Sequence, residues 1–190
     1  MAKNTNIHEY YNELVTAAKE PTKPYYCYNK DRAHNAAILS AMFKTSNKVK
    51  MYCGSMSIFR KEFVNKIGKD EDKYIMSVLA DNLKKFAAKE NTSLEIIVEE
   101  YPEMGFSDLI DEETLGKMMD TGTLKLYKLG DVAFKESIPH FTLATPCFVR
   151  SEQDKVEHTA LCGINNEEFM KSSERNFEAI KDLATQVTSL

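Results

Sequence analysis

The side chain best suited to chemistry in this sequence is His140, which opens the apolar segment HFTLAT at residues 140–145. An imidazole titrates near neutral pH, so it serves as a nucleophile or as a general acid and base. In a strand, His140 would share one face with Thr142, while Phe141 and Leu143 would share the face that meets the core. A histidine with a hydroxyl two residues away can hold a phosphate. A strand-end histidine hydrogen-bonded to a backbone carbonyl is the structural alternative.

A second polar feature is the corner CGINNEEF, which joins an apolar segment to the last amphipathic segment of the chain. Gly163 allows close approach of a backbone, and Asn165 or Asn166 can cap the following helix. Helix N-termini attract anions, so this corner is a candidate phosphate-binding element. Plain helix capping explains the same residues. The two features indicate one site only if they converge in space.

Apolar periodicity and breakers predict the elements that would position these residues. Six strands are expected, at residues 48–53, 94–98, 123–129, 140–145, 147–150 and 159–164. The expected helices cover about 6–19, 31–45, 72–89, 112–119 and 166–184, with a short one before Gly68. This alternation predicts an α/β fold, a mixed sheet of about six strands flanked by helices. We expect an N-terminal helix and lead-in at 1–28 and a single domain at 29–190.

Composition limits the class of protein. The chain has 190 residues and a formal net charge of -4, so its overall field does not indicate a nucleic-acid binder. No apolar run is long enough to span a bilayer, and no signal peptide is evident, so we expect no membrane partner and a cytoplasmic location. The four cysteines are far apart and form no C-x-x-C, which predicts small buried residues rather than a metal site.

The order of these elements resembles the phospholipase D-like (HKD) superfamily over about residues 29–184. In that superfamily one strand begins with His-x-Lys, a second strand ends in Gly-Ser-x-Asn, and a helix closes the unit. The segments PHFTLAT, ALCGINN and EEFMKSSERNFEAIKDLA follow the same order here. Two such units, often from identical chains, form one phosphodiesterase site. The resemblance therefore implies a phospholipase D-like sheet, a homodimer, and chemistry that needs no metal ion or other cofactor.

The motif residues carry over one by one. His140 matches the nucleophilic histidine, and Gly163 and Asn166 match the Gly-x-x-Asn corner. The resemblance thus implies that His140, Thr142 and Asn166 stand at the catalytic positions. It also implies that Gly163 and Asn165 lie beside the phosphate.

The motif is incomplete. Thr142 stands where the superfamily has its phosphate-binding lysine, and Ile164 replaces the serine. A charge clamp on a developing oxyanion is typically worth about 3 kcal/mol. We therefore expect a degenerate domain, unless a partner chain or one of Lys155, Arg150 and Lys171 supplies the positive charge.

Three hypotheses follow. The one we favour is a non-catalytic binding or scaffold module for nucleic-acid or other phosphates, acting as a homodimer or with a protein partner. The second is an active, metal-independent phosphodiesterase or nuclease with His140 as nucleophile. The third rests on His140-x-Thr142-Leu143, which is similar to the half-signature of the 2H phosphoesterases, with His158 as the second histidine.

Overall fold

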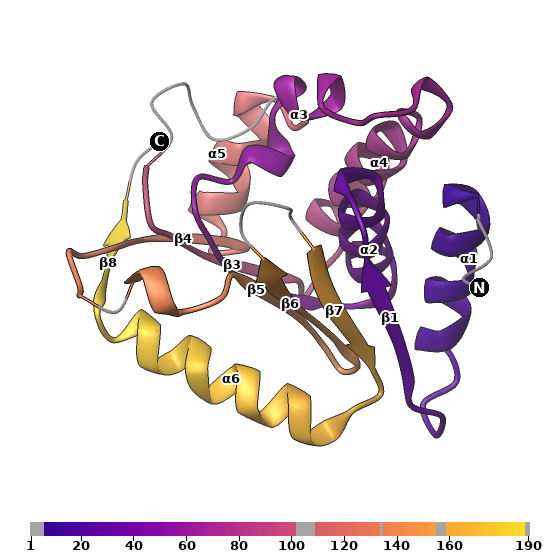
Figure 1. Ribbon diagram of the computed structural model, residues 1–190. Helices are drawn as coiled ribbons and strands as arrows, with labels where there is room; N and C mark the ends of the chain where they lie inside the picture. Colours follow the sequence, from indigo (N-terminus) through magenta and orange to yellow (C-terminus); the bar gives the residue numbers. More distant parts are fainter. Residues whose placement is uncertain (1–5, 102–108, 134, 155–158, 189–190) are drawn as a thin grey trace.

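The computed structural model describes residues 6–101, 109–133, 135–154 and 159–188, apart from the side chains of Lys61 and Glu71. These ranges form an eight-stranded sheet with helices on both faces (Figure 1). The strands are β1 Tyr25–Asn29, β2 Lys48–Cys53, β3 Ser93–Val98, β4 Leu124–Leu129, β5 Phe141–Thr145, β6 Phe148–Asp154, β7 Thr159–Ile164 and β8 Ala184–Val187. The α-helices are α1 Ile7–Ala18, α2 Arg32–Thr45, α3 Lys61–Asn65, α4 Ile75–Ala87, α5 Glu112–Asp120 and α6 Glu167–Lys181. Three 3-10 turns lie at Ser57–Phe59, Asp70–Asp72 and Lys135–Ser137.

The strand order across the sheet is β1-β7-β6-β5-β2-β3-β4-β8. β2, β3 and β4 run parallel, and every other neighbouring pair is antiparallel. The predicted mixed α/β sheet flanked by helices is therefore confirmed, but the expected number of about six strands is too low. The two additional strands, β1 and β8, form the two edges of the sheet.

The C-terminal part of the chain differs from the expected helix over 166–184. α6 ends at Lys181, and Ala184–Val187 then pairs antiparallel with β4 as β8. A four-residue strand that is exposed along one edge has too few apolar positions to produce a strand pattern of its own. Its pairing with β4 decides its structure, and that partner lies more than fifty residues earlier in the chain.

Two apolar layers fill the space on either side of the sheet. On one face α1, α2 and α4 cover side chains such as Val49, Ile96 and Ala144. On the other face α6 places Phe177 and Ile180 among side chains that include Phe141 and Leu143 (Figure 1). Parallel strands buried on both faces read as apolar runs rather than strict alternations, as in LEIIV.

Local sequence explains how the helices begin. Asp31 caps α2, since its Oδ1 accepts a hydrogen bond of 3.0 Å from the backbone N–H of His34. Asp111 caps α5 in the same way through Thr114 at 2.8 Å. Asn6 caps α1, accepting from His8 at 2.8 Å. Among the described residues, the helices include none that is both long and apolar enough to cross a membrane.

Candidate functional site

His140 lies immediately before β5, where the hairpin β5–β6 meets the carboxyl ends of the parallel strands β2 and β3. Its imidazole packs against Gly54, and a Cβ added at Gly54 would lie 3.3 Å from the ring atom Cε1. The side chain of His140 is 19% exposed. Open α/β sheets bind ligands beyond the carboxyl ends of their strands. The position of His140 therefore fits a ligand site.

Each ring nitrogen of His140 faces a carboxylate. Nδ1 lies 2.8 Å from Oε2 of Glu152, at a distance that makes a hydrogen bond. Because a carboxylate only accepts, this bond places a proton on Nδ1. Nε2 lies 3.2 Å from Oε1 of Glu99, close enough for an ion pair but without a well-aligned hydrogen bond. The histidine is thus held between two acidic side chains.

Tyr52 fixes the carboxylate of Glu99. Its hydroxyl donates a hydrogen bond of 2.6 Å to Oε1 of Glu99, the same oxygen that faces His140. The Tyr52 ring also meets the imidazole edge to face, with centroids 5.6 Å apart. Burial and the hydrogen bond to Glu99 raise the pKa of the Tyr52 hydroxyl, so it remains protonated and continues to donate. Glu99 is therefore held in front of Nε2.

Thr142 and Arg150 are directly opposite each other in the hairpin β5–β6. Both are buried, with exposures of 3% and 5%. Nη2 of Arg150 donates to Oε1 of Glu152 over 3.5 Å, and Glu152 is the carboxylate that also holds His140. Burial lowers the pKa of the guanidinium, and Glu152 opposes that shift. Of the two described side chains that could replace the missing lysine, Arg150 and Lys171, Arg150 is the one beside Thr142.

These residues line a partly open cavity of about 200 Å³. Its polar wall includes His140, Thr142, Arg150 and Glu152, and the end of β2 with the residues that follow it, 51–58, lines another side. Among its lining residues, which the structure describes, Arg150 is the only lysine or arginine. The cavity can hold a small polar group, but its positive charge is already paired with a carboxylate.

The face of β5 that carries Thr142 is less polar than expected. The alternation of side chains is as predicted, since Phe141 and Leu143 face α6. Ala144, however, packs into the layer beneath α1, α2 and α4, and Thr142 is nearly as buried. Helices cover both faces of this sheet at β5, so Thr142 is not presented to solvent.

The Gly-x-x-Asn corner lies at the other end of the hairpin. β7 runs antiparallel to β6, so Ile164 pairs with Phe148, whereas Glu152, the partner of His140, pairs with Ala160. The length of β5 separates the two ends by about 13 Å at 3.3 Å per residue. The structure does not bring His140 together with Asn166.

The polar groups of this corner have structural partners. Asn165 has a φ of 57° and donates from Nδ2 to the carbonyls of Ala17, Glu20 and Lys23, closing the turn between α1 and β1. Asn166 caps α6, accepting from the N–H of Phe169 at 2.8 Å, and its Nδ2 also contacts the Tyr26 hydroxyl.

The remaining candidates are placed elsewhere. Lys155 and His158 lie outside the described residues. Lys171 is on exposed α6, where it pairs with Glu167 at 2.5 Å, on the opposite face of the sheet from Thr142. Gly163 lies against the ring of Phe169. Within the described ranges, no three His, Cys, Asp or Glu side chains are grouped as metal ligands.

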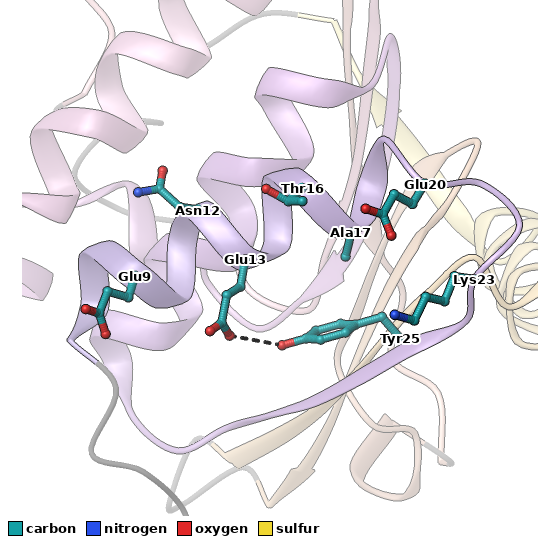
Figure 2. Close-up of a pocket in the computed structure, with 8 residues that line it drawn as sticks. All are labelled: Glu9, Asn12, Glu13, Thr16, Ala17, Glu20, Lys23 and Tyr25. Atoms are coloured by element: carbon teal, nitrogen blue, oxygen red, sulfur yellow. Dashed lines mark hydrogen bonds between the residues drawn. The ribbon is translucent and has the colours of Figure 1, made fainter.

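A second, larger hollow of about 500 Å³ lies between α1 and the start of β1 (Figure 2). Three glutamates line it, Glu9, Glu13 and Glu20, and Lys23 is the basic residue on its rim. Figure 2 shows the Tyr25 hydroxyl pointing to Glu13, to which it donates at 3.4 Å. A phosphate would meet an excess of negative charge here. The residues that line this hollow include no histidine or cysteine, whereas the cavity beside His140 combines an imidazole, a guanidinium and a carboxylate. The cavity beside His140 is therefore the candidate site for chemistry.

Three residues of the site were not singled out from the sequence: Tyr52, Glu99 and Glu152. Glu152 had a detectable signal, because it shares with Arg150 one face of a segment that begins as apolar FV. Glu99 directly follows the apolar segment LEIIV, where the carboxyl end of a buried parallel strand would lie. Glu152 meets His140 across the hairpin β5–β6. Tyr52 and Glu99 meet it only because β5 pairs with β2, about ninety residues earlier in the chain, and local patterns do not encode that pairing.

The chain matches no family model and no curated protein sequence. Several solved structures share its fold. The archaeal chromatin protein TrmBL2, described with a novel mode of DNA binding, aligns with a TM-score of 0.54 and 9% identity, over 84% of this chain and 53% of that protein. This chain thus spans about half the length of TrmBL2.

The alignments with two other structures include most of this chain and almost all of the matched chain. Nuc from Salmonella typhimurium, a phospholipase D family member, has a TM-score of 0.53 and 10% identity over 88% of this chain and 100% of Nuc. NucT from Helicobacter pylori has a TM-score of 0.50 and 10% identity over 87% of this chain and 99% of NucT. At this identity the likeness establishes the fold alone.

Proposed function

We propose that this chain, which has a phospholipase D-like fold, is a degenerate member that binds phosphate-containing ligands, nucleic acid first among them, without hydrolysing them. The observation that carries the proposal is the pair of carboxylates on the imidazole of His140, at 2.8 Å and 3.2 Å.

A histidine that attacks phosphorus needs one ring nitrogen free and a positive environment for the phosphate. Here Nδ1 is bonded to Glu152, and Glu99 stands in front of Nε2. Thr142 provides no charge, and Arg150 is already paired with Glu152. An incoming phosphate would therefore meet two negative groups where a catalytic site needs cations, which raises the barrier instead of lowering it.

Nucleic acid is the proposed ligand because of the descriptions of the proteins that share this fold. One is an archaeal chromatin protein described with a mode of DNA binding, and another is a phospholipase D family member. The net charge of -4 means that any such binding uses a local basic surface rather than the overall field. Binding to phosphates is strongly salt-dependent, and this provides the test.

The experiment is fluorescence anisotropy with labelled single- and double-stranded DNA over a range of salt concentrations. We expect binding that weakens steadily as salt rises. His140→Ala should leave it unchanged, since Arg150, the one lysine or arginine among the residues that line the His140 cavity, is already paired with Glu152. Absence of binding to both DNA forms at low salt would contradict the nucleic-acid part of the proposal.

The second hypothesis, an active phosphodiesterase with His140 as nucleophile, has one observation in its favour. Glu152 orients Nδ1 as the third member of a catalytic triad would, and Arg150 brings a cation beside Thr142. It predicts hydrolysis that resists chelators and disappears in His140→Ala. The 2H interpretation additionally requires His158, and it predicts that His158→Ala is equally inactive.

We also propose that the chain forms a homodimer, and that residues 29–190 form the domain proper with 1–28 as an extension. Light scattering coupled to size exclusion tests the first point, with a mass of twice 21.7 kDa expected. For the second, removal of 1–28 should leave a folded protein. Loss of cooperative unfolding in that truncation would show that β1, which pairs with β7, is integral to the domain.

A further inference from the structure

Two cysteines face each other across the edge of the sheet. β1 pairs antiparallel with β7, and Cys27 is directly opposite Cys162 in that register. The two thiols lie close enough for each to shift the pKa of the other. Cys27 is partly exposed, whereas Cys162 is fully buried. This pairing joins residues that are far apart in the sequence, so neither cysteine stands out as one of a pair in the sequence alone.

The spacing of opposite residues in an antiparallel pair permits a disulfide. Their Cα atoms are typically about 4.5 or 5.5 Å apart, and disulfides span Cα separations of roughly 4.4–6.8 Å. Both side chains lie on the face of the sheet beneath α1 and α2, because Cys162 is in that core layer and Cys27 packs against it. The register of β1 and β7 is therefore compatible with a disulfide between these two positions.

The surroundings of Cys27 favour reaction at its sulfur. The hydroxyl of Tyr10, on α1, donates a hydrogen bond of 3.2 Å to Sγ of Cys27. Hydrogen bonds from Cys162 and then Tyr10 lower the pKa of the Cys27 thiol, with burial opposing them. The pKa of Cys162 is raised, by the hydrogen bond to Cys27 and by burial. The two thiols therefore have different roles.

We propose that Cys27 and Cys162 are a redox-active pair that a hydroperoxide converts to a reversible disulfide between β1 and β7. The inference goes beyond the proposed function and does not depend on it. Its consequence is mechanical: the bond would fasten the edge strand β1, and the turn that joins α1 to it, to the neighbouring strand β7.

The chemistry balances in two steps. The Cys27 thiolate attacks the terminal oxygen of the hydroperoxide, its O–O bond breaks, and the products are a sulfenic acid at Cys27 and the corresponding alcohol, or water from hydrogen peroxide. The Cys162 sulfur then attacks the sulfenic sulfur, the S–O bond breaks, and the oxygen leaves as water with the thiol proton. The pair loses two hydrogens, and a dithiol reductant reverses the change.

The other cysteines provide controls. Burial raises the pKa of Cys147 to about 11 and that of Cys53 to about 12, so both thiols are far less reactive at neutral pH. Cys147 belongs to the same buried layer as Cys162, and the residue after it, Phe148, pairs with Ile164 of β7. It is the one competing partner that the experiment must separate from Cys27.

The test is peptide mapping by mass spectrometry of the folded full-length chain after limiting hydrogen peroxide, with free thiols alkylated before unfolding. Wild type, Cys27→Ser, Cys162→Ala, Cys147→Ala and Cys53→Ala are compared, each checked for native circular dichroism. We expect a Cys27–Cys162 cross-linked peptide in wild type, Cys147→Ala and Cys53→Ala, lost again on treatment with dithiothreitol.

The two remaining variants assign the roles. Cys162→Ala should accumulate sulfenic acid at Cys27, trapped by dimedone, and Cys27→Ser should show no oxidation at Cys162 under the same conditions. A cross-link between Cys162 and Cys147, a cross-link between two chains, or equal reactivity of all four thiols would overturn the proposal. If Cys27→Ser fails to fold, Cys27→Ala serves for the same comparison.

Discussion

At the scale of single residues, Glu152 is the centre of the candidate site. One of its oxygens accepts a hydrogen bond from Nδ1 of His140, and the other accepts one from Nη2 of Arg150. A single buried carboxylate therefore orients the imidazole and balances the charge of the guanidinium. Arg150 is as buried as Glu152, whereas His140 is 19% exposed. Buried ion pairs add little net stability, but removing one partner leaves an uncompensated charge in a medium of low dielectric constant.

Glu152→Ala should therefore lower the free energy of unfolding by about 3 kcal/mol, because it strands the Arg150 guanidinium. Urea denaturation followed by circular dichroism measures the change. Glu167→Ala is the matched control, because Glu167 pairs with Lys171 on the exposed surface and its loss should not move the midpoint. Equal midpoints for wild type and Glu152→Ala would show that Arg150 does not depend on this carboxylate.

Substitutions at Asn166 distinguish two roles for this residue, a helix cap and a phosphate ligand. Asn166→Ala should cost about 1 kcal/mol, the usual loss for an N-cap, whereas Asn166→Asp should keep the stability because aspartate caps equally well. Neither change should alter DNA affinity if the corner is only structural. Weaker DNA binding by Asn166→Ala than by Asn166→Asp, measured by anisotropy at equal folded fraction, would restore Asn166 as a ligand.

At the scale of elements, α6 is held against β7 by a close approach at Gly163. A Cβ at this position would lie 2.9 Å from Cδ1 of Phe169, on the first turn of α6. Gly163→Ala should therefore displace the helix and cost about 1–3 kcal/mol by overpacking. Thermal unfolding provides the measurement.

The control for Gly163 is a glycine with open space. Gly116 lies within α5, and a Cβ there meets nothing within 4 Å. Gly116→Ala should stabilise the protein by about 0.5–1 kcal/mol, because alanine loses less backbone entropy in a helix. If Gly163→Ala instead stabilised the protein, the Phe169 ring would have moved aside without loss of stability, and α6 would not be anchored at that point.

The helices and strands were more predictable from the sequence than the tertiary contacts between them. Local periodicity was enough for β2, β3, β4 and the four long helices, because each buries an apolar stripe of its own. The resemblance to the phospholipase D-like superfamily, which rests on the order of the elements, predicted that His140 and the Gly-x-x-Asn corner form one site. The order of elements along the chain does not specify the direction of each strand. Because β7 runs back along β6, the corner ends at the Phe148 end of the hairpin, and the carboxylates of Glu99 and Glu152 meet His140 instead.

At the scale of the whole molecule, ion pairs connect the helical layer of α6 to the sheet. Lys50 of β2 contacts Glu174 at 2.9 Å and Glu178 at 2.6 Å, both on α6. Lys181 makes a similar contact with Glu95 of β3 at 2.5 Å. These contacts span more than eighty residues of sequence, so their loss affects the docking of α6 rather than its helicity.

Acid should weaken this docking. The hydrogen bond from Lys50 holds the pKa of Glu178 below its ordinary value of 4.5. Its stabilising contribution is therefore complete above about pH 4.5 and is lost as the pH falls below that value. Glu178→Gln and Lys50→Met should both show a shallower fall in melting temperature between pH 5 and about pH 3 than wild type. Parallel curves for all three proteins would contradict the coupling.

The central claim is that the histidine site does not hydrolyse phosphodiesters. The most direct measurement is release of p-nitrophenol from bis(p-nitrophenyl) phosphate and cleavage of labelled single-stranded DNA, after treatment with chelator, by wild type and His140→Ala side by side. We predict that the two proteins give the same background rate. Turnover by wild type that His140→Ala abolishes would contradict the account, and would make His140 a nucleophile and Arg150 its phosphate-binding cation.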